Sequence, residues 1–127
     1  MRAVDTNVLL RAIVNDDAAQ AALAHELLRD DCFVSTSVLL ETAWVLKSYY
    51  GFDRAQLAAA LLALLSAETV HVVHPERVGR AMAGFAAGAD FADMIHLAEA
   101  TDFDAFVTFD RALASLADPP VPVELLR

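Results

Sequence analysis

Short apolar runs alternate along this chain with longer segments in which apolar residues recur at helical spacing. The first run ends at Val4 and is followed by Asp5, and an apolar pattern of helical period begins directly after Asn7. Three later runs of the same kind predict further strands, and a fifth run that contains Pro122 predicts an edge strand. The predicted strands cover residues 3–4, 32–35, 70–73, 105–109 and 121–123.

Helical patterns fill the segments between these runs, and polar residues at their starts are suitable N-caps. We expect Thr6 to cap the first helix, Asp16 or Asp17 the second, and Thr36 or Ser37 the third. The predicted helices cover residues 8–14, 18–28, 37–50, 54–65, 75–88 and 91–101, with a short one after residue 110. Strands separated by helices favour an α/β fold, here a three-layer α/β/α sandwich with a mostly parallel sheet of four to five strands. Residues 1–127 are expected to form a single domain.

Composition narrows the possible environments of the chain. Hydrophobic residues make up 57% of its 127 residues, yet no apolar run is long enough to cross a membrane. We see no signal peptide, and the lone Cys32 excludes an intramolecular disulfide, so we expect a cytoplasmic protein. The apolar surplus suggests a buried partner surface.

Several acidic residues lie at positions that a parallel sheet would bring to the edge formed by the carboxyl ends of its strands. Asp5 and Asp110 each follow a predicted strand directly, and ligands of open α/β sheets bind outside the carboxyl ends of the strands. Glu41 is a lone acid in an apolar helical segment, and Asp93 falls in the first turn of the helix before the fourth strand. Asp90 lies three residues before Asp93 on the same helix face.

Carboxylates gathered in one crevice would repel one another strongly. Each close pair at ~4 Å costs on the order of 4 kcal/mol at an effective dielectric constant near 20. A divalent cation is the natural occupant of such a cluster, and oxygen ligands favour Mg²⁺ or Mn²⁺ over zinc. Carboxylate-held metals can activate water and stabilise a leaving oxygen in phosphodiester cleavage.

Four motifs at these positions resemble those of the PIN-domain ribonucleases, and in particular the VapC-type toxins of bacterial toxin–antitoxin pairs. They are Asp5-Thr6-Asn7, Glu41, the segment from Gly88 to Asp93, and Thr108-Phe109-Asp110-Arg111. The resemblance extends over essentially the whole chain. It implies an endoribonuclease in which Asp5, Glu41, Asp93 and Asp110 hold Mg²⁺ or Mn²⁺.

The resemblance also assigns roles to individual residues. Asp5 and Asp93 would be the most direct metal ligands, Glu41 would help to hold the attacking water, and Asp110 would support the metal site. Small polar residues would orient the carboxylates by hydrogen bonds, and one further acid would have a secondary role. These supporting residues are Thr6, Asn7, Thr108 and Asp90.

The implied partners are RNA, a cognate antitoxin and a second copy of the chain. The antitoxin would lay an apolar segment in a groove and direct a basic side chain toward the acids. The net charge of −9 is unusual for an RNA-binding protein, and discounting four of its eighteen acids as metal ligands still leaves −5. RNA would therefore be held by metal and by a few local bases, for which Arg11, Lys47 and Arg111 are the candidates.

Other interpretations of the same residues remain open. A Mg²⁺-dependent phosphatase could use Asp5 as its nucleophile, although such enzymes usually carry a second Asp where this chain has Asn7. A non-catalytic PIN-fold interaction module would have no reason to keep mutually repelling acids. An Asp after a strand can also serve only as a turn former or helix cap. Trp44, Tyr49 and Tyr50 are interpreted as core or dimer contacts rather than as groups that stack on bases.

Overall fold

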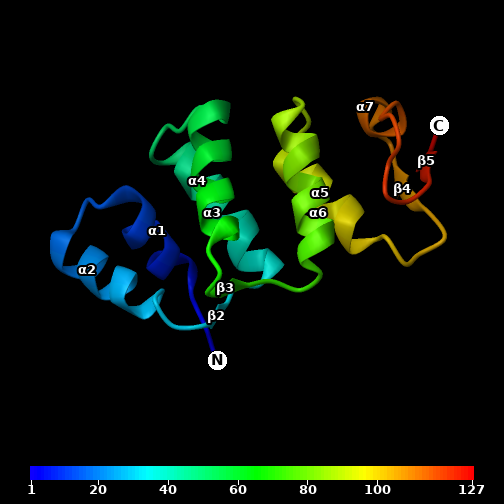
Figure 1. Cartoon of the computed structure of the whole chain (residues 1–127). Coiled ribbons are helices and arrows are strands. Elements are labelled where there is room, and N and C mark those ends of the chain that lie inside the picture. Colours follow the sequence, from blue (N-terminus) through cyan, green and yellow to red (C-terminus); the bar gives the residue numbers. More distant parts are fainter. The chain divides into compact units, whose positions relative to one another are not determined.

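The computed structural model describes all 127 residues, and in it one or two helices separate each strand from the next along the chain (Figure 1). The strands are β1 (Arg2–Ala3), β2 (Cys32–Phe33), β3 (Val70–His71), β4 (Phe106–Thr108) and β5 (Val123–Leu125). The helices are α1 (Thr6–Val14), α2 (Ala18–Leu27), α3 (Thr36–Ser48), α4 (Arg54–Ser66), α5 (Pro75–Ala86), α6 (Phe91–Glu99) and α7 (Arg111–Ala114). The predicted α/β class is confirmed.

The elements fall into two compact units, unit 1 (Met1–Pro75) and unit 2 (Glu76–Arg127). Unit 1 has a parallel sheet in the order β1-β2-β3, and unit 2 has the parallel pair β4-β5. All strand pairs are therefore parallel, as predicted, and the five strands form two sheets, one in each unit. The single domain over residues 1–127 stays a prediction.

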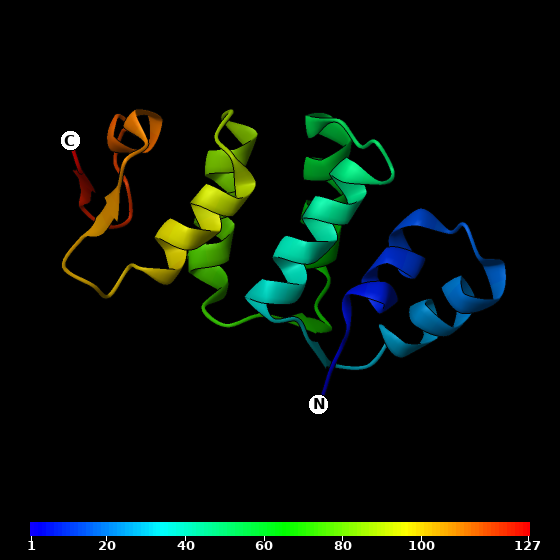
Figure 2. The ribbon, with the colours of Figure 1, turned by 180° about the vertical axis from the view of Figure 1, so that it is seen from behind.

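Within unit 1, two pairs of helices flank the short strands. Helices α1 and α2 lie side by side, and α3 and α4 form a second pair; both pairs are visible in the front and back views (Figures 1 and 2). Leu9, Leu39, Leu46 and Leu61 are fully buried, one or two from each of α1, α3 and α4. Burying apolar side chains of this size is the main stabilising contribution to such a unit.

The N-caps of α1 and α3 lie one residue earlier than predicted. Asp5, not Thr6, caps α1, and Ser35, not Thr36 or Ser37, caps α3. Strands β1 and β2 end so early that the last extended residue before each helix can already turn its side-chain oxygen onto the first helical N–H groups. At the other end of α3, Gly51 has a φ of 70°, the left-handed conformation that glycine commonly adopts just after a helix.

The last strand was predicted too early in the chain. β5 begins at Val123 rather than at residue 121, and it pairs in parallel with β4. Pro122 has no N–H to give to a ladder, but its carbonyl oxygen accepts the N–H of Phe106 at 2.8 Å. The proline therefore sits at the entry of the strand, and the paired residues follow it.

Helix α4 begins with a capping box. The Asp53 side chain accepts the N–H of Gln56 at 2.8 Å, and the Gln56 side chain accepts the N–H of Asp53 at 3.0 Å. We expect Asp53→Ala to lower the free energy of unfolding by about 1 kcal/mol, because helix N–H groups lose their acceptor. Urea unfolding followed by circular dichroism measures the change. Asp104→Ala, in an exposed turn, is the control; an equal loss there would contradict the assignment.

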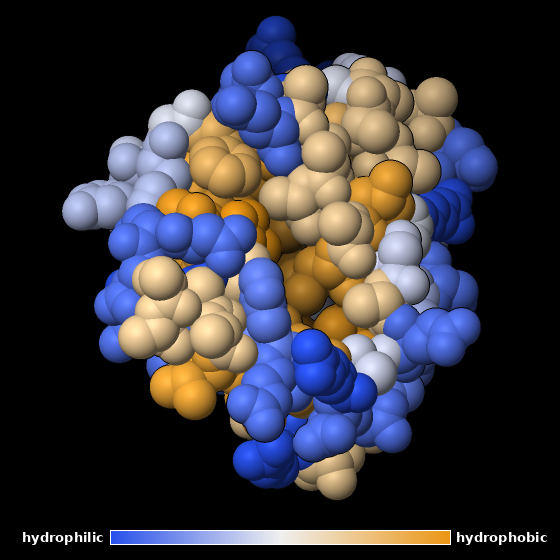
Figure 3. Space-filling view, turned by 60° about the vertical axis from the view of Figure 1, so that its left-hand side comes forward, coloured by the Kyte–Doolittle hydropathy of each residue, from blue (hydrophilic) through white to orange (hydrophobic).

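Part of the apolar surplus lies on the surface, where hydrophobic and hydrophilic residues are intermixed (Figure 3). Trp44 and Tyr49 were predicted to be core or dimer contacts; they are 67% and 79% exposed, so the core alternative is wrong for both and the dimer contact stays a prediction. Both lie on or next to the solvent face of α3, whose buried side is occupied by smaller residues. No helix is both long and apolar enough to cross a membrane.

Candidate functional site

Asp5 stands in unit 1 between β1 and α1. Its backbone is extended, and its carboxylate accepts the N–H of Thr6 at 2.8 Å, which makes it the N-cap of α1. The side chain is nevertheless exposed, so the cap leaves carboxylate oxygen open to a ligand. The positive end of the α1 dipole also favours a negative charge there.

A hydrogen bond fixes Glu41 near the start of α1. The hydroxyl of Thr6 donates to Oε1 of Glu41 at 2.5 Å, across 35 positions of sequence. Thr6 is only 4% exposed, whereas Glu41 lies on the exposed face of α3. The buried hydroxyl therefore limits the rotamers of a carboxylate that is otherwise in solvent, which is how a supporting residue orients a ligand.

In unit 2, two acids are helix N-caps, Asp90 between α5 and α6 and Asp110 just after β4. Asp90 accepts the N–H of Asp93 at 3.1 Å and caps α6, and Asp110 accepts the N–H of Ala112 at 2.8 Å and caps α7. Thr108 accepts the N–H of Asp110 at 3.0 Å, so its hydroxyl positions the backbone of this acid rather than its carboxylate. Asp5, Asp90 and Asp110 are thus all helix caps, as the alternative interpretation of these acids expected.

Asp93 differs from these three acids. It is half-buried in the first turn of α6, and no hydrogen bond engages its carboxylate. Burial raises its pKa, and the negative charges of Asp90 and Asp110 raise it further, while His96 on the next turn acts in the opposite direction. A carboxylate that is partly desolvated, unpaired and repelled by its neighbours has no evident structural role.

Asp90, Asp93 and Asp110 line one cavity of about 810 Å³, together with a fourth acid, Asp118, and with Arg80. Its wall also includes the apolar side chains of Met94 and Leu97. Oxygen donors on an apolar wall suit Mg²⁺ or Mn²⁺ better than zinc. No three Asp, Glu, His or Cys side chains in the chain are grouped tightly enough to hold a metal ion without moving.

The predicted quartet is divided between the two units. Asp5 and Glu41 belong to unit 1, where Thr6 bonds to both, and Asp93 and Asp110 belong to unit 2, where they share the cavity. The convergence of all four stays a prediction. Asn7 is exposed beside the groove between α1 and α2.

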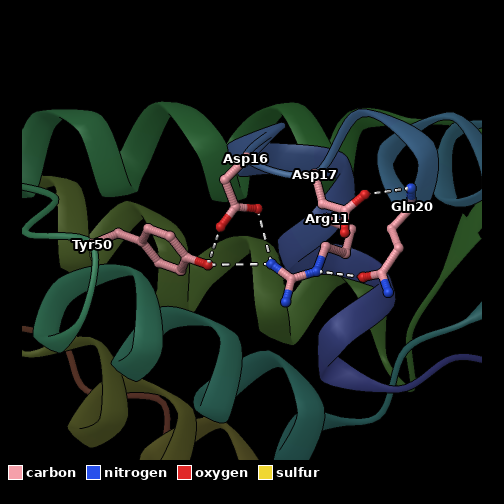
Figure 4. Close-up of polar contacts among 5 residues, drawn as sticks. All are labelled: Arg11, Asp16, Asp17, Gln20 and Tyr50. Atoms are coloured by element: carbon pink, nitrogen blue, oxygen red, sulfur yellow. Dashed lines mark hydrogen bonds and ion pairs between the residues drawn. The ribbon is translucent and has the colours of Figure 1, made fainter.

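Of the three predicted RNA-binding bases, Arg11 is held by the protein itself (Figure 4). Its guanidinium donates to Asp16 at 2.9 Å, to Gln20 at 2.8 Å and to the Tyr50 hydroxyl at 3.4 Å. The Tyr50 hydroxyl in turn donates to Asp16 at 2.9 Å; this bond above all lowers the pKa of Asp16, and the Tyr50 contact above all raises that of Arg11. Arg11 therefore links α1, α2 and the end of α3, which weakens its case as a phosphate contact.

Lys47 and Arg111 remain available for a ligand. Both are exposed, and neither side chain takes part in a hydrogen bond or ion pair. The sequence did not single out Trp44 as a functional residue, although its position three residues after Glu41 puts both on one helix face.

The raised pKa of Asp93 predicts how the stability of the metal-free protein depends on pH. The ordinary value is 3.8, and folding raises it, so the folded protein binds this proton more firmly than the unfolded chain does. The contribution of Asp93 to stability is therefore fully present below pH 3.8 and is lost as the pH rises through the folded pKa. We expect the stability difference between Asp93→Asn and wild type to grow from pH 4 upward in chelator, as urea titrations would measure. A difference independent of pH would contradict the assignment.

One family model matches residues of both units. The model described as PIN domain matches residues 2–119, which include almost all of unit 1, most of unit 2 and every predicted site residue. Among curated proteins, none matches the chain at a significant level. PIN domains are generally metal-dependent nucleases, so the match supports a hydrolase that acts on nucleic acid. The order of the elements, the parallel strands, the acids at their ends and this match together show that the chain belongs to the PIN domain family.

Proposed function

We propose that the chain is a Mg²⁺- or Mn²⁺-dependent endoribonuclease and the cytoplasmic toxin of a type II toxin–antitoxin pair. Membership of the PIN domain family supports a metal-dependent nuclease. The finer assignment rests on the resemblance of the four acidic motifs to VapC-type toxins.

The observation that carries the proposal is the state of Asp93. Its carboxylate is half-buried, accepts no hydrogen bond and lies near Asp90 and Asp110, which raise its pKa. Without a ligand this arrangement destabilises the protein, and a divalent cation would convert the repulsion into attraction. A protein that only bound a partner, without a metal ion, would have nothing to offset the repulsion among these carboxylates.

Each acid has a proposed task. Asp5 and Asp93 would hold the metal directly, Asp110 would support it directly or through water, and Glu41, held by Thr6, would orient the attacking water. The metal would supply charge for the phosphate oxygens and lower the pKa of bound water. Asp90 would remain mainly the cap of α6.

An apolar groove in unit 1 supports the proposed antitoxin. It has a volume of about 230 Å³, and Val8, Leu23, Ala24 and Leu27 of α1 and α2 line it. Leu23 is largely exposed, so an apolar segment of a partner could cover it with a gain in hydrophobic free energy. We also propose that the chain forms a homodimer.

The test is cleavage of RNA by purified protein free of any partner. We expect cleavage with Mg²⁺ or Mn²⁺ and none with EDTA. Asp5→Asn should be inactive but folded, because asparagine caps a helix as well as aspartate does while it lacks the ligand charge. Asp104→Asn, an exposed turn acid, is the matched control and should retain full activity.

Two outcomes would overturn the proposal. Activity that survives in both Asp5→Asn and Asp93→Asn would exclude a metal site built on these acids. An acyl-phosphate trapped on Asp5 after incubation with a phosphomonoester would assign the site to a phosphatase instead.

A further inference from the structure

One face of α3 carries the proposed catalytic acid and the only tryptophan of the chain. Glu41 and Trp44 are three residues apart, so their side chains are neighbours on the helix surface. Ser37 and Ser48 are exposed on the same line, before and after them. Trp44 thus stands one turn beyond the carboxylate that Thr6 holds in place.

The core of unit 1 does not account for Trp44. The side of α3 that packs inward is made by Leu39, Thr42, Ala43 and Leu46, all of which are buried. The indole projects away from that side and is 67% exposed, and no ring contact or hydrogen bond engages it. A large aromatic surface left in water beside a candidate site points to a ligand.

The surroundings of Trp44 favour nucleic acid over a second protein surface. Its neighbours three and four residues away on α3 are Leu40, Glu41, Lys47 and Ser48, of which only Leu40 is apolar. Lys47 is exposed and unpaired, and it lies about 4.5 Å further along the helix axis than Trp44. Protein interfaces are depleted of charge at their centres, whereas single-stranded RNA is bound by aromatic rings flanked by cations.

We propose that Trp44 stacks on an unpaired base next to the phosphate that is cleaved, while Lys47 contacts a flanking phosphate. The inference rests on the proposed endoribonuclease function and adds the residue of this chain that would hold a base beside the cleaved phosphate. A base inside a duplex is stacked on its neighbours and offers no free face to the indole. Trp44 would therefore select unpaired segments of RNA.

Because Trp44 is the only tryptophan, its fluorescence reports on this contact directly. The probe is a short unstructured RNA titrated into wild-type protein in EDTA, where cleavage is not expected, with anisotropy of labelled RNA as an independent measure of binding. We expect quenching with the same midpoint as the anisotropy change. A duplex of the same sequence should quench far less.

Substitutions give a second readout that does not depend on fluorescence. Loss of one stacked base should weaken binding roughly 5- to 150-fold, so we expect Trp44→Ala to reduce RNA affinity within this range and Trp44→Phe to reduce it less. Lys47→Gln should reduce the salt dependence of binding. Tyr49→Ala is the matched control, because Tyr49 is an aromatic residue even more exposed than Trp44 and points about 140° away from it around the helix; this variant should bind RNA like wild type.

The outcomes separate this inference from the proposed function. If RNA is cleaved but Trp44→Ala binds and cleaves it like wild type, stacking is wrong and the nuclease stands. If wild type neither binds nor cleaves RNA, the proposed function fails and the stacking inference fails with it. Emission that is blue-shifted and shielded from acrylamide only at high protein concentration would show that a second copy covers Trp44, which would also overturn the inference.

Discussion

Replacing Asp93 by asparagine is expected to slow RNA cleavage strongly and, at the same time, to make the metal-free protein more stable. Activity should fall by roughly 10²–10³-fold, because an electrostatic group acting on the reacting phosphate is lost. The melting temperature in EDTA should rise, because a half-buried charge that Asp90 and Asp110 repel is removed. Cleavage assays and thermal melts with EDTA and with Mg²⁺ measure both effects.

Thermal melts with Mg²⁺ distinguish wild type from Asp93→Asn more clearly than melts in EDTA do. Mg²⁺ should raise the melting temperature of wild type and should have much less effect on Asp93→Asn, since a ligand that binds only the folded state stabilises it. Asp90→Asn keeps the cap of α6 and serves as control: it should stay active while it also becomes more stable in EDTA. An Asp93→Asn protein that is less stable than wild type in EDTA would show that the carboxylate has a structural role.

Thr6→Val is expected to lower activity about 10- to 100-fold with little change in stability. Valine matches the shape of threonine in this buried position but cannot donate to Glu41. Loss of a residue that orients a ligand typically has an effect of this size. Because Glu41 is exposed and can be solvated instead, the free energy of unfolding should change by about 1 kcal/mol or less.

Thr6→Ser separates the hydroxyl from the methyl group. It keeps the donor, so we expect activity near that of wild type, with a small loss of packing. Cleavage rates over a range of Mn²⁺ concentrations would show whether Thr6→Val needs more Mn²⁺ than wild type for the same rate. This is the result expected if Thr6 positions Glu41 for the metal site. Equal activities of the valine and serine variants would mean that the bond between Thr6 and Glu41 does not contribute to the reaction.

Three of the acids serve the fold and, by proposal, the chemistry. Asp5, Asp90 and Asp110 cap helices, and the dipole at each helix N-terminus stabilises the negative charge. The helices thereby make it less costly to keep these three carboxylates in place. Asparagine at such a position retains the cap and loses the charge, so it is a more informative substitution than alanine.

Local patterns in the sequence were sufficient for the class of fold and the order of its elements. Spacing of apolar residues, polar residues at helix starts and Gly51 after α3 act over a few residues, so they can be recognised without knowledge of distant contacts. The acids at the ends of β1 and β4 were predicted in the same way, because a strand end and the next helix start are adjacent in sequence. The PIN domain match agrees with that pattern.

Tertiary contacts decided what those patterns left open. Thr6 pairs with Glu41 across 35 positions, Arg11 is held by Tyr50 just beyond the end of α3, and Asp93 is repelled by Asp110. None of these contacts has a sequence signature, because each joins segments that only the folded chain brings together. The exposure of Trp44 is of the same kind: an aromatic residue in an apolar segment fits a core equally well, and only packing shows which side of α3 faces inward.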